Sequence, residues 1–159
     1  MSKPSSRTRI DSASRVILAP PRTLFRAFID AEAMAAWRAP DGMTARILAF
    51  DPRVGGGYRM LLRHDAPTSP VEGKTRPGED EVEVRFVELL AHERIIEDVT
   101  FLSDDPAFAG TMTLTTLFQP DRDGTKVTLE ATGVPPGIAP EDHRLGMAAS
   151  LRNLARLTE

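Results

Sequence analysis

The sequence contains no cysteine, so it can form neither disulfides nor thiolate centres. A zinc site would therefore have to use His, Asp and Glu side chains only. The histidines His64, His92 and His143 lie in three separate segments, without a carboxylate or a second histidine at the spacing of metal ligands. We therefore predict no metal site, and nothing in the sequence indicates a cofactor.

Long apolar runs and an excess of positive charge are also missing. The first apolar run, residues 16–19, is far too short for a signal peptide or a membrane span. The formal net charge is −3, and the lysines and arginines are scattered instead of forming a basic stripe. We expect a cytoplasmic protein with neither nucleic acid nor a membrane as partner. The sequence leaves open whether it forms a homodimer.

Known catalytic and phosphate-binding patterns are absent as well. There is no Gly-x-Ser-x-Gly elbow, and Ser150 lies in an apolar helical segment without an evident His-Asp relay. The three consecutive glycines 55–57 match neither a dinucleotide fingerprint nor a P-loop, and a strand pattern follows them. We interpret them as a structural feature that permits positive φ or a close backbone approach. The acidic residues 79–81 and 104–105 lack calcium-loop spacing and are expected in solvated loops.

The composition that remains is that of one compact domain. The chain has 159 residues, of which 41% are hydrophobic and 27% are charged, a balance that fills one sizeable core. We expect residues 1–13 to be a disordered or flexible N-terminus and residues 14–159 to form a single domain. Prolines, glycines and acidic residues over positions 65–81 predict a loop.

The first third of the chain predicts a strand followed by two short helices. Residues 15–19 are rich in β-branched side chains and stop at Pro20. Over residues 21–29, Leu24, Phe25 and Phe28 share one helical face. Asp30 is placed to cap a second helix over residues 31–37, which a Pro-Asp-Gly sequence then ends.

The rest of the chain predicts six strands and one long helix. Alternating patterns cover residues 44–50, 57–64, 82–89, 94–101, 111–118 and 125–132, with turn chemistry at residues 120–124. After residue 140, Met147, Leu151, Leu154 and Leu157 recur at helical spacing. This order predicts an α+β fold of about seven strands, in which a curved antiparallel sheet wraps around the C-terminal helix.

The order of elements, with four local stretches, resembles the SRPBCC (START-like, Bet v-like helix-grip) superfamily. Within it, the chain is similar to proteins related to the activator of heat shock protein 90 ATPase homologue, over residues 14–158. The stretches are residues 21–37, 51–59 (DPRVGGGYR), 88–96 and Gly146-Met147. The family commonly has tryptophan where this chain has Met147, so the size of the ligand does not carry over.

A helix-grip fold implies a pocket between the sheet and the last helix. Alternation and helical spacing select its candidate lining residues, most of which would also serve simply to fill a core. Trp37 and Tyr58 stand out because their polar tips need a partner or solvent. The candidates are Phe28, Trp37, Tyr58, Met60, Phe86, Glu97, Phe101, Met112, Leu114, Met147 and Leu151.

Glu97 is the one acidic residue among these candidates. Alternation places it on the inward face of its strand, where it would orient a ligand or move a proton. The alternatives are a bulge that turns it outward or a pair with Arg59 or Arg63. Asp98 is expected to face solvent. His64 is a weaker catalytic candidate, and a surface position is the better explanation for it, because a lone histidine rarely marks a site without a neighbouring partner.

Members of the superfamily bind hydrophobic ligands, cyclise aromatic compounds or contact chaperones. We expect this chain to bind a small hydrophobic molecule, and no motif marks it as an enzyme. One alternative is a cyclase-like or dehydratase-like enzyme for an aromatic or polyketide-like substrate, with Glu97 and His64 as acid and base. The other is a chaperone-associated interaction domain, a role that usually comes with a further domain.

Overall fold

The computed structural model of the chain describes residues 9–39, 42–64 and 79–159. Within these residues, seven strands form one antiparallel sheet in the order β1-β7-β6-β5-β4-β3-β2. Successive strands from β2 to β7 are neighbours, and β1 lies at the edge beside β7, which confirms the predicted α+β meander. The strands are β1 (Asp11–Ile17), β2 (Met43–Leu48), β3 (Gly57–His64), β4 (Glu79–Leu90), β5 (Arg94–Phe101), β6 (Thr111–Asp121) and β7 (Gly124–Thr132).

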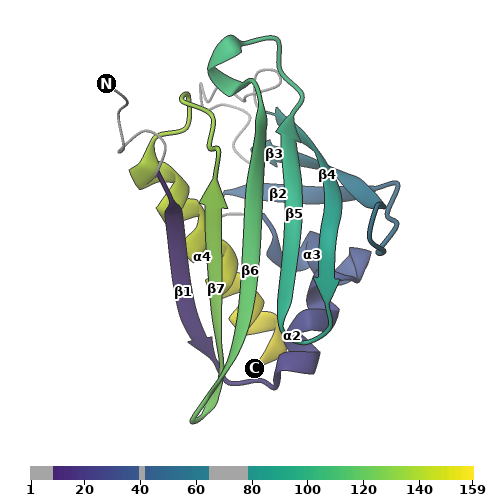
Figure 1. The fold of residues 1–159 in the computed structure, drawn as a ribbon, viewed down its shortest axis with the longest axis vertical. Helices are drawn as coiled ribbons and strands as arrows, with labels where there is room; N and C mark the ends of the chain where they lie inside the picture. Colours follow the sequence, from purple (N-terminus) through teal and green to yellow (C-terminus); the bar gives the residue numbers. More distant parts are fainter. Residues whose placement is uncertain (1–8, 40–41, 65–78) are drawn as a thin grey trace.

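Helices cover the concave side of this sheet. α2 (Pro21–Phe28) and α3 (Ala31–Trp37) follow β1, a 3-10 turn η1 (Pro106–Phe108) precedes β6, and α4 (Pro140–Thr158) ends the chain. In Figure 1, α4 lies behind β1 and β7, while β2 and β3 cross behind the longer strands, so the sheet curls towards the helices. No helix in the described part of the chain is long and apolar enough to cross a membrane.

The two short helices form one packed unit. Pro21 occupies the first turn of α2, where its missing N–H costs nothing. The Asp30 carboxylate caps α3 by accepting from the Ala33 amide at 3.1 Å. The indole Nε1 of Trp37 donates to the carbonyl of Ala27 at 2.9 Å, which ties the end of α3 to α2. The position of the residue after Trp37 is therefore fixed.

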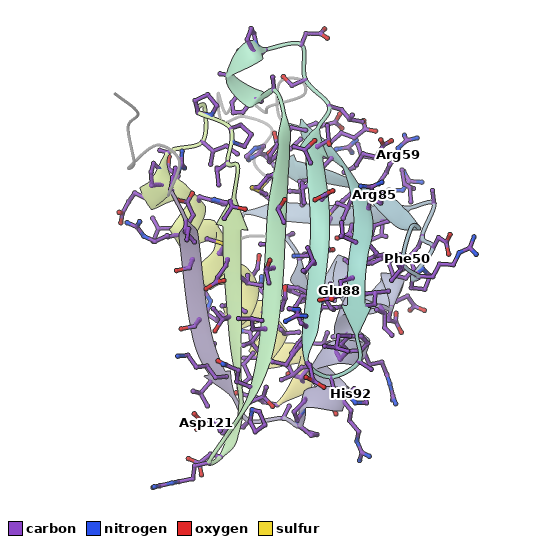
Figure 2. All side chains as sticks on the ribbon, in the orientation of Figure 1. Phe50, Arg59, Arg85, Glu88, His92 and Asp121 are labelled. Carbon is purple, nitrogen blue, oxygen red and sulfur yellow. The ribbon has the colours of Figure 1, made fainter. Side chains whose placement is uncertain are left out.

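The strand pattern and its turn follow the sequence closely. In β6, every second position is buried, as the alternation predicts, namely Met112, Leu114, Thr116 and Phe118. Asp121 pairs with Gly124, so the β6–β7 hairpin closes with a two-residue turn. Figure 2 shows Asp121 at the far end of this hairpin.

The run of three glycines is structural, as predicted. Gly55 has φ +87, a conformation that side chains disfavour. A Cβ on Gly57 would lie 1.9 Å from the carbonyl oxygen of Val84 in the neighbouring strand. A register shift between Phe86 and Glu88 lies close by in β4. Here β3 and β4 approach closely where the sheet bends.

The structure corrects the expected boundaries of two strands. β1 begins at Asp11, inside the segment expected to be flexible. Its first residues are small and polar and have little strand preference of their own, but they pair with β7. Residues 79–81, expected in a solvated loop, open β4, and Asp80 and Glu81 are buried. Arg59 and Arg63 of β3 form ion pairs with Glu81 and Glu79, and not with Glu97.

The structure also corrects the apolar face predicted for α4, at its last position. Met147, Leu151 and Leu154 are buried, but Leu157 is 47% exposed because it lies in the last turn of the helix. Most of the predicted loop, residues 65–78, lies outside the described residues. So do positions 40–41 of the predicted helix break.

Candidate functional site

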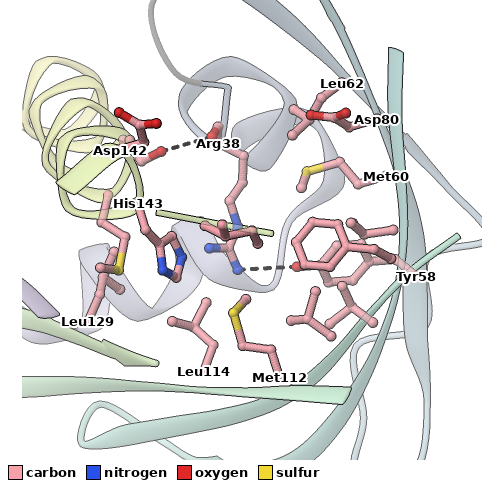
Figure 3. A pocket seen from close by; sticks show the side chains of 18 residues that line it. Arg38, Tyr58, Met60, Leu62, Asp80, Met112, Leu114, Leu129, Asp142 and His143 are labelled. Atoms are coloured by element: carbon pink, nitrogen blue, oxygen red, sulfur yellow. Dashed lines mark hydrogen bonds between the residues drawn. The ribbon is translucent and has the colours of Figure 1, made fainter. Parts of the chain in front are cut away.

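The concave face of the sheet and α4 enclose a cavity of about 260 Å³ (Figure 3). Most of its wall is apolar and comes from β3 to β7 on one side and from α4 and the loop before it on the other. The apolar lining residues are Met60, Leu62, Val82, Val84, Val99, Phe101, Met112, Leu114, Leu129, Ile138 and Met147. The polar lining residues are Arg38, Tyr58, Asp80, Asp142, His143 and Ser150. Such a wall suits a small, mainly apolar molecule.

Arg38 enters this cavity from the end of α3, where it is the C-cap residue. The hydroxyl of Ser150 on α4 donates to the backbone carbonyl of Arg38 at 2.9 Å. The amide of Asn153, one turn further along α4, donates to the carbonyl of Ala39 at 2.8 Å. The C-terminal helix thus holds the short segment that carries the guanidinium.

The Arg38 guanidinium forms a buried polar cluster with Glu97 of β5 and Tyr58 of β3. Its Nη2 donates to Glu97 Oε1 at 2.8 Å and to the Tyr58 hydroxyl at 3.2 Å. The Tyr58 hydroxyl donates to Glu97 Oε2 at 2.8 Å. The side chains of Arg38 and Glu97 are only 9% and 1% exposed. Each buried charge therefore has its partner, as burial of a charge requires.

Two aromatic rings pack against the guanidinium of Arg38. Its central carbon lies 4.9 Å from the ring centroid of Trp37 and 5.5 Å from that of Phe28. The two rings contact each other with centroids 4.6 Å apart. A desolvated cation over two aromatic faces is held in one orientation.

The hydrogen bonding of Arg38 is nevertheless incomplete. Its Nε is fully covered and has no hydrogen-bond partner in the described part of the chain. Its Nη1 makes no hydrogen bond to any described residue, because the bonds of the side chain all involve Nη2. The guanidinium therefore has unused donors beside an apolar cavity.

Burial and the neighbouring groups together set the protonation states of Arg38 and Tyr58. Burial alone would lower the pKa of Arg38, but the charge of Glu97 and the Tyr58 oxygen raise it above its ordinary value. Burial raises the pKa of Tyr58 well above its ordinary value, and Glu97 adds to this effect while Arg38 opposes it. In the folded protein, Arg38 therefore stays a cation and Tyr58 stays protonated, so its hydroxyl remains a hydrogen-bond donor.

A second polar group reaches the cavity from the first turn of α4. His143 Nδ1 lies 2.8 Å from Oδ2 of Asp11, which is 2% exposed. Arg9 donates to both oxygens of the same carboxylate, at 3.1 and 2.8 Å. The hydrogen bond from Arg9 lowers the pKa of Asp11 against the opposing effect of burial, and His143 lowers it further. An ionised Asp11 accepts hydrogen bonds only, so His143 presents its proton there through Nδ1.

Six predicted pocket residues line the cavity, namely Tyr58, Met60, Phe101, Met112, Leu114 and Met147. Phe28, Trp37, Phe86 and Leu151 do not line it, because they are packed inside the core with 0–1% exposure. Glu97 faces inward as predicted, without a bulge that turns it outward, but it lies behind Arg38 and Tyr58 and does not line the cavity. Asp98 faces the other side, where it accepts from Arg85 at 3.2 Å.

The weaker catalytic candidate does not join Glu97. In the sheet, Glu97 pairs with Phe86, whereas Gly57 of β3 pairs with the neighbouring Arg85. His64 lies at the opposite end of β3, seven residues from Gly57. At about 3.3 Å per residue, this separates them by roughly 23 Å along the strand. His64 is also not part of the cavity wall. Within the described residues, no group of His, Asp and Glu has the geometry of a metal site.

No sequence pattern marks Arg38, Asp142 or His143 as residues of this cavity. Arg38 follows a helix, where a cation is usually a solvated cap. His143 has no partner at short spacing, because Asp11 lies 132 residues away. Both become visible only when the fold brings distant segments together.

Comparison with known proteins places the chain in a family. The family model described as "Activator of Hsp90 ATPase homolog 1-like protein" matches residues 18–159. A protein of Chromobacterium violaceum with a solved crystal structure is 33% identical, with a TM-score of 0.82, over 94% of this chain and 96% of that one. A search of curated protein sequences found no significant match.

More distant structures share the fold. A protein from Rhodobacter sphaeroides is 20% identical, with a TM-score of 0.76, over 98% of this chain and 94% of that one. DynU16, from the dynemicin biosynthetic locus, is 15% identical, with a TM-score of 0.64, over 92% of this chain and 46% of that one. At these identities the likeness concerns the fold alone.

Proposed function

The chain belongs to the family of Activator of Hsp90 ATPase homolog 1-like proteins, and we propose that it binds a small, largely apolar molecule between the sheet and α4. The observation that carries this proposal is the cavity of about 260 Å³, whose wall is mainly apolar. Removing apolar surface from water supplies the affinity, at roughly 25 cal/mol for each Å² buried. The few polar groups at the wall orient the ligand.

Met147 allows a direct test of where the ligand binds. It is buried at the wall of the cavity on α4, so tryptophan at this position fills part of the space. Leu145 lies two residues earlier on the same helix and is 63% exposed. Met147→Trp is therefore the cavity-filling variant. Leu145→Trp is its control, because it also replaces an apolar residue of α4 with tryptophan, but at an exposed position.

The experiment combines native mass spectrometry of the purified protein with thermal-shift titration against aromatic, fatty and polyketide-like compounds. A ligand present at 100 times its Kd stabilises the folded state by about 2.7 kcal/mol. For a domain of this size, that raises Tm by about 5–10 °C. Met147→Trp should abolish the shift, and Leu145→Trp should keep it. Absence of both a bound mass and any shift would contradict the proposal.

An acid–base enzyme is the second candidate, and one observation favours it. His143, hydrogen-bonded to the buried Asp11, lines the same cavity as Arg38. A carboxylate that orients an imidazole is a common arrangement for proton transfer. Fold similarity to a protein from a biosynthetic locus is compatible with this role. Turnover of a bound compound, lost in His143→Gln but not in His64→Gln, would support this candidate over simple binding.

A further inference from the structure

We infer that the ligand carries an uncharged hydrogen-bond acceptor, a carbonyl oxygen, that binds Nη1 of Arg38. This inference rests on the proposed binding function and specifies the chemical class of the ligand. It depends on three properties of Arg38, which are its unused donors, its fixed position and the balance of charge around it.

The unused donors come first. An arginine side chain has five N–H groups, and among the residues that the structure describes only those on Nη2 have acceptors. Nε is fully covered without a partner, whereas Nη1 is not among the fully covered atoms. A ligand that covered Nη1 without giving it an acceptor would leave a buried unpaired donor, which is costly in folded proteins. An acceptor in the cavity would complete the hydrogen bonding of this side chain at Nη1.

The position of Arg38 is fixed before any ligand arrives. Glu97 and Tyr58 hold Nη2, and the rings of Trp37 and Phe28 support the guanidinium plane. Ser150 holds the backbone of Arg38 from α4. A donor that is already oriented loses little conformational freedom when it binds, so its hydrogen bond contributes to affinity almost in full.

The charge balance selects a neutral acceptor over an anion. Glu97 neutralises Arg38 within the cluster. Asp142 is a further acidic group at the cavity wall, and Asp11, which lies directly behind His143, is paired with Arg9. Even a protonated His143 would not make this set of groups positive. A carboxylate would therefore lose its hydration without a net positive charge to replace it, whereas a carbonyl oxygen needs only a donor.

The test uses three probes of the same shape on a naphthalene ring. They are 2-acetylnaphthalene, its hydrocarbon analogue 2-isopropenylnaphthalene and the anion 2-naphthoate, each titrated calorimetrically. A hydrogen bond from a charged donor strengthens binding by about 10-fold to 100-fold. We expect the ketone to bind at least 10-fold more tightly than the hydrocarbon, and more tightly than the carboxylate.

The double variant Arg38→Met/Glu97→Gln removes the donor without leaving an unpaired charge. It should bind the ketone and the hydrocarbon within about threefold of each other, the residual expected once this bond is gone. Arg53→Met is the control, because Arg53 lies in an exposed ion pair with Asp51. It should keep the full preference for the ketone.

A second measurement keeps the test valid if the double variant does not fold. In the unaltered protein, nitrogen NMR signals of the Arg38 guanidinium should shift with the ketone and not with the hydrocarbon. Equal affinity for ketone and hydrocarbon, tightest binding of the carboxylate, or an unchanged Arg38 signal would overturn the inference while the proposed function stands. If none of the three probes binds, the proposed apolar binding fails for this class, and the inference fails with it.

Discussion

The Arg38 guanidinium and the Glu97 carboxylate form a buried ion pair across 59 positions of the chain, with Nη2 and Oε1 2.8 Å apart. The pair joins the end of α3 to the middle of β5, and Arg38 lines the cavity while Glu97 does not. Because both side chains are largely removed from water, the cost of desolvating the two charges offsets much of their attraction, so the pair adds little net stability although loss of one partner is costly.

This arrangement predicts strong coupling between the two residues. Arg38→Met alone leaves a carboxylate buried without a cation and should lower the free energy of unfolding by about 3–5 kcal/mol. Arg38→Met/Glu97→Gln should cost clearly less than the sum of the single variants, with a coupling of about 1–3 kcal/mol. Urea unfolding measures all three. Arg53→Met, in an exposed pair, should change the same quantity by less than about 1 kcal/mol.

Additive single costs would contradict this prediction, because independent residues show no coupling. The same result would indicate that water reaches Glu97 in solution. The control separates these cases from a general effect of replacing arginine with methionine.

Tyr58 predicts how the protein behaves at alkaline pH. It is the only tyrosine of the sequence, so absorbance near 295 nm reports its ionisation alone. Burial raises its pKa above the ordinary value of 10.0. The folded state therefore holds this proton more tightly than the unfolded state does, and the associated stability is present below pH 10 and lost as pH rises further. Tyrosinate should appear only together with unfolding, as followed by circular dichroism.

Free ionisation of Tyr58 near pH 10 in the folded protein would contradict this prediction. Tyr58→Phe tests the same hydrogen bond at neutral pH. Because it leaves one Glu97 oxygen with fewer donors, it should cost about 1–3 kcal/mol of unfolding free energy.

The fold followed from sequence patterns because those patterns are local. Alternation in β6 and the turn before Gly124 each depend on a few adjacent residues, and both predictions were confirmed. The start of β4 was missed because Glu79 and Glu81 are acidic residues whose strand position depends on Arg63 and Arg59 in another strand. Tertiary pairing decided that boundary.

The cavity was predictable only in part, for a related reason. Alternation tells which face of a strand points inward, so it found Glu97, Met112 and Leu114. It does not tell how far the helix stands from that face, which decides whether a side chain lines space or fills the core. Helical spacing likewise assigns Phe28 and Trp37 to the cavity wall, whereas they form a packed layer that contacts the Arg38 guanidinium.

Asp11 predicts the behaviour of the protein in acid. Arg9 and His143 contact this carboxylate, and its pKa lies below its ordinary value of 3.8. The stability that comes from this lowered pKa is fully present above the ordinary pKa of the unfolded state. It is lost as pH falls through the lower pKa of the folded state. Asp11→Asn should thus be less stable than the unaltered protein at pH 5–7, and the difference should shrink below about pH 4.

Urea unfolding between pH 3 and pH 7 measures this difference. Asp142→Asn is a matched control, because Asp142 is exposed on the first turn of α4 beside His143. Its effect should stay below about 1 kcal/mol, as is usual for an exposed charge near a helix N-terminus. A difference for Asp11→Asn that does not depend on pH would show that its effect comes from packing and not from the ionised carboxylate.

Two glycines should respond to alanine in opposite directions. At Gly57 a new Cβ would meet the Val84 carbonyl oxygen at 1.9 Å, and backbone atoms of a paired strand cannot move aside cheaply. At Gly146, inside α4, no atom lies within 4 Å of the added carbon apart from the adjacent residues and the backbone of the helix itself. Gly57→Ala should lower the unfolding free energy by about 1–3 kcal/mol, and Gly146→Ala should raise it by about 0.5–1 kcal/mol, because alanine restricts the unfolded chain more than glycine does. If urea unfolding gave Gly57→Ala the stability of the unaltered protein, the close approach of β3 to β4 would not persist in solution.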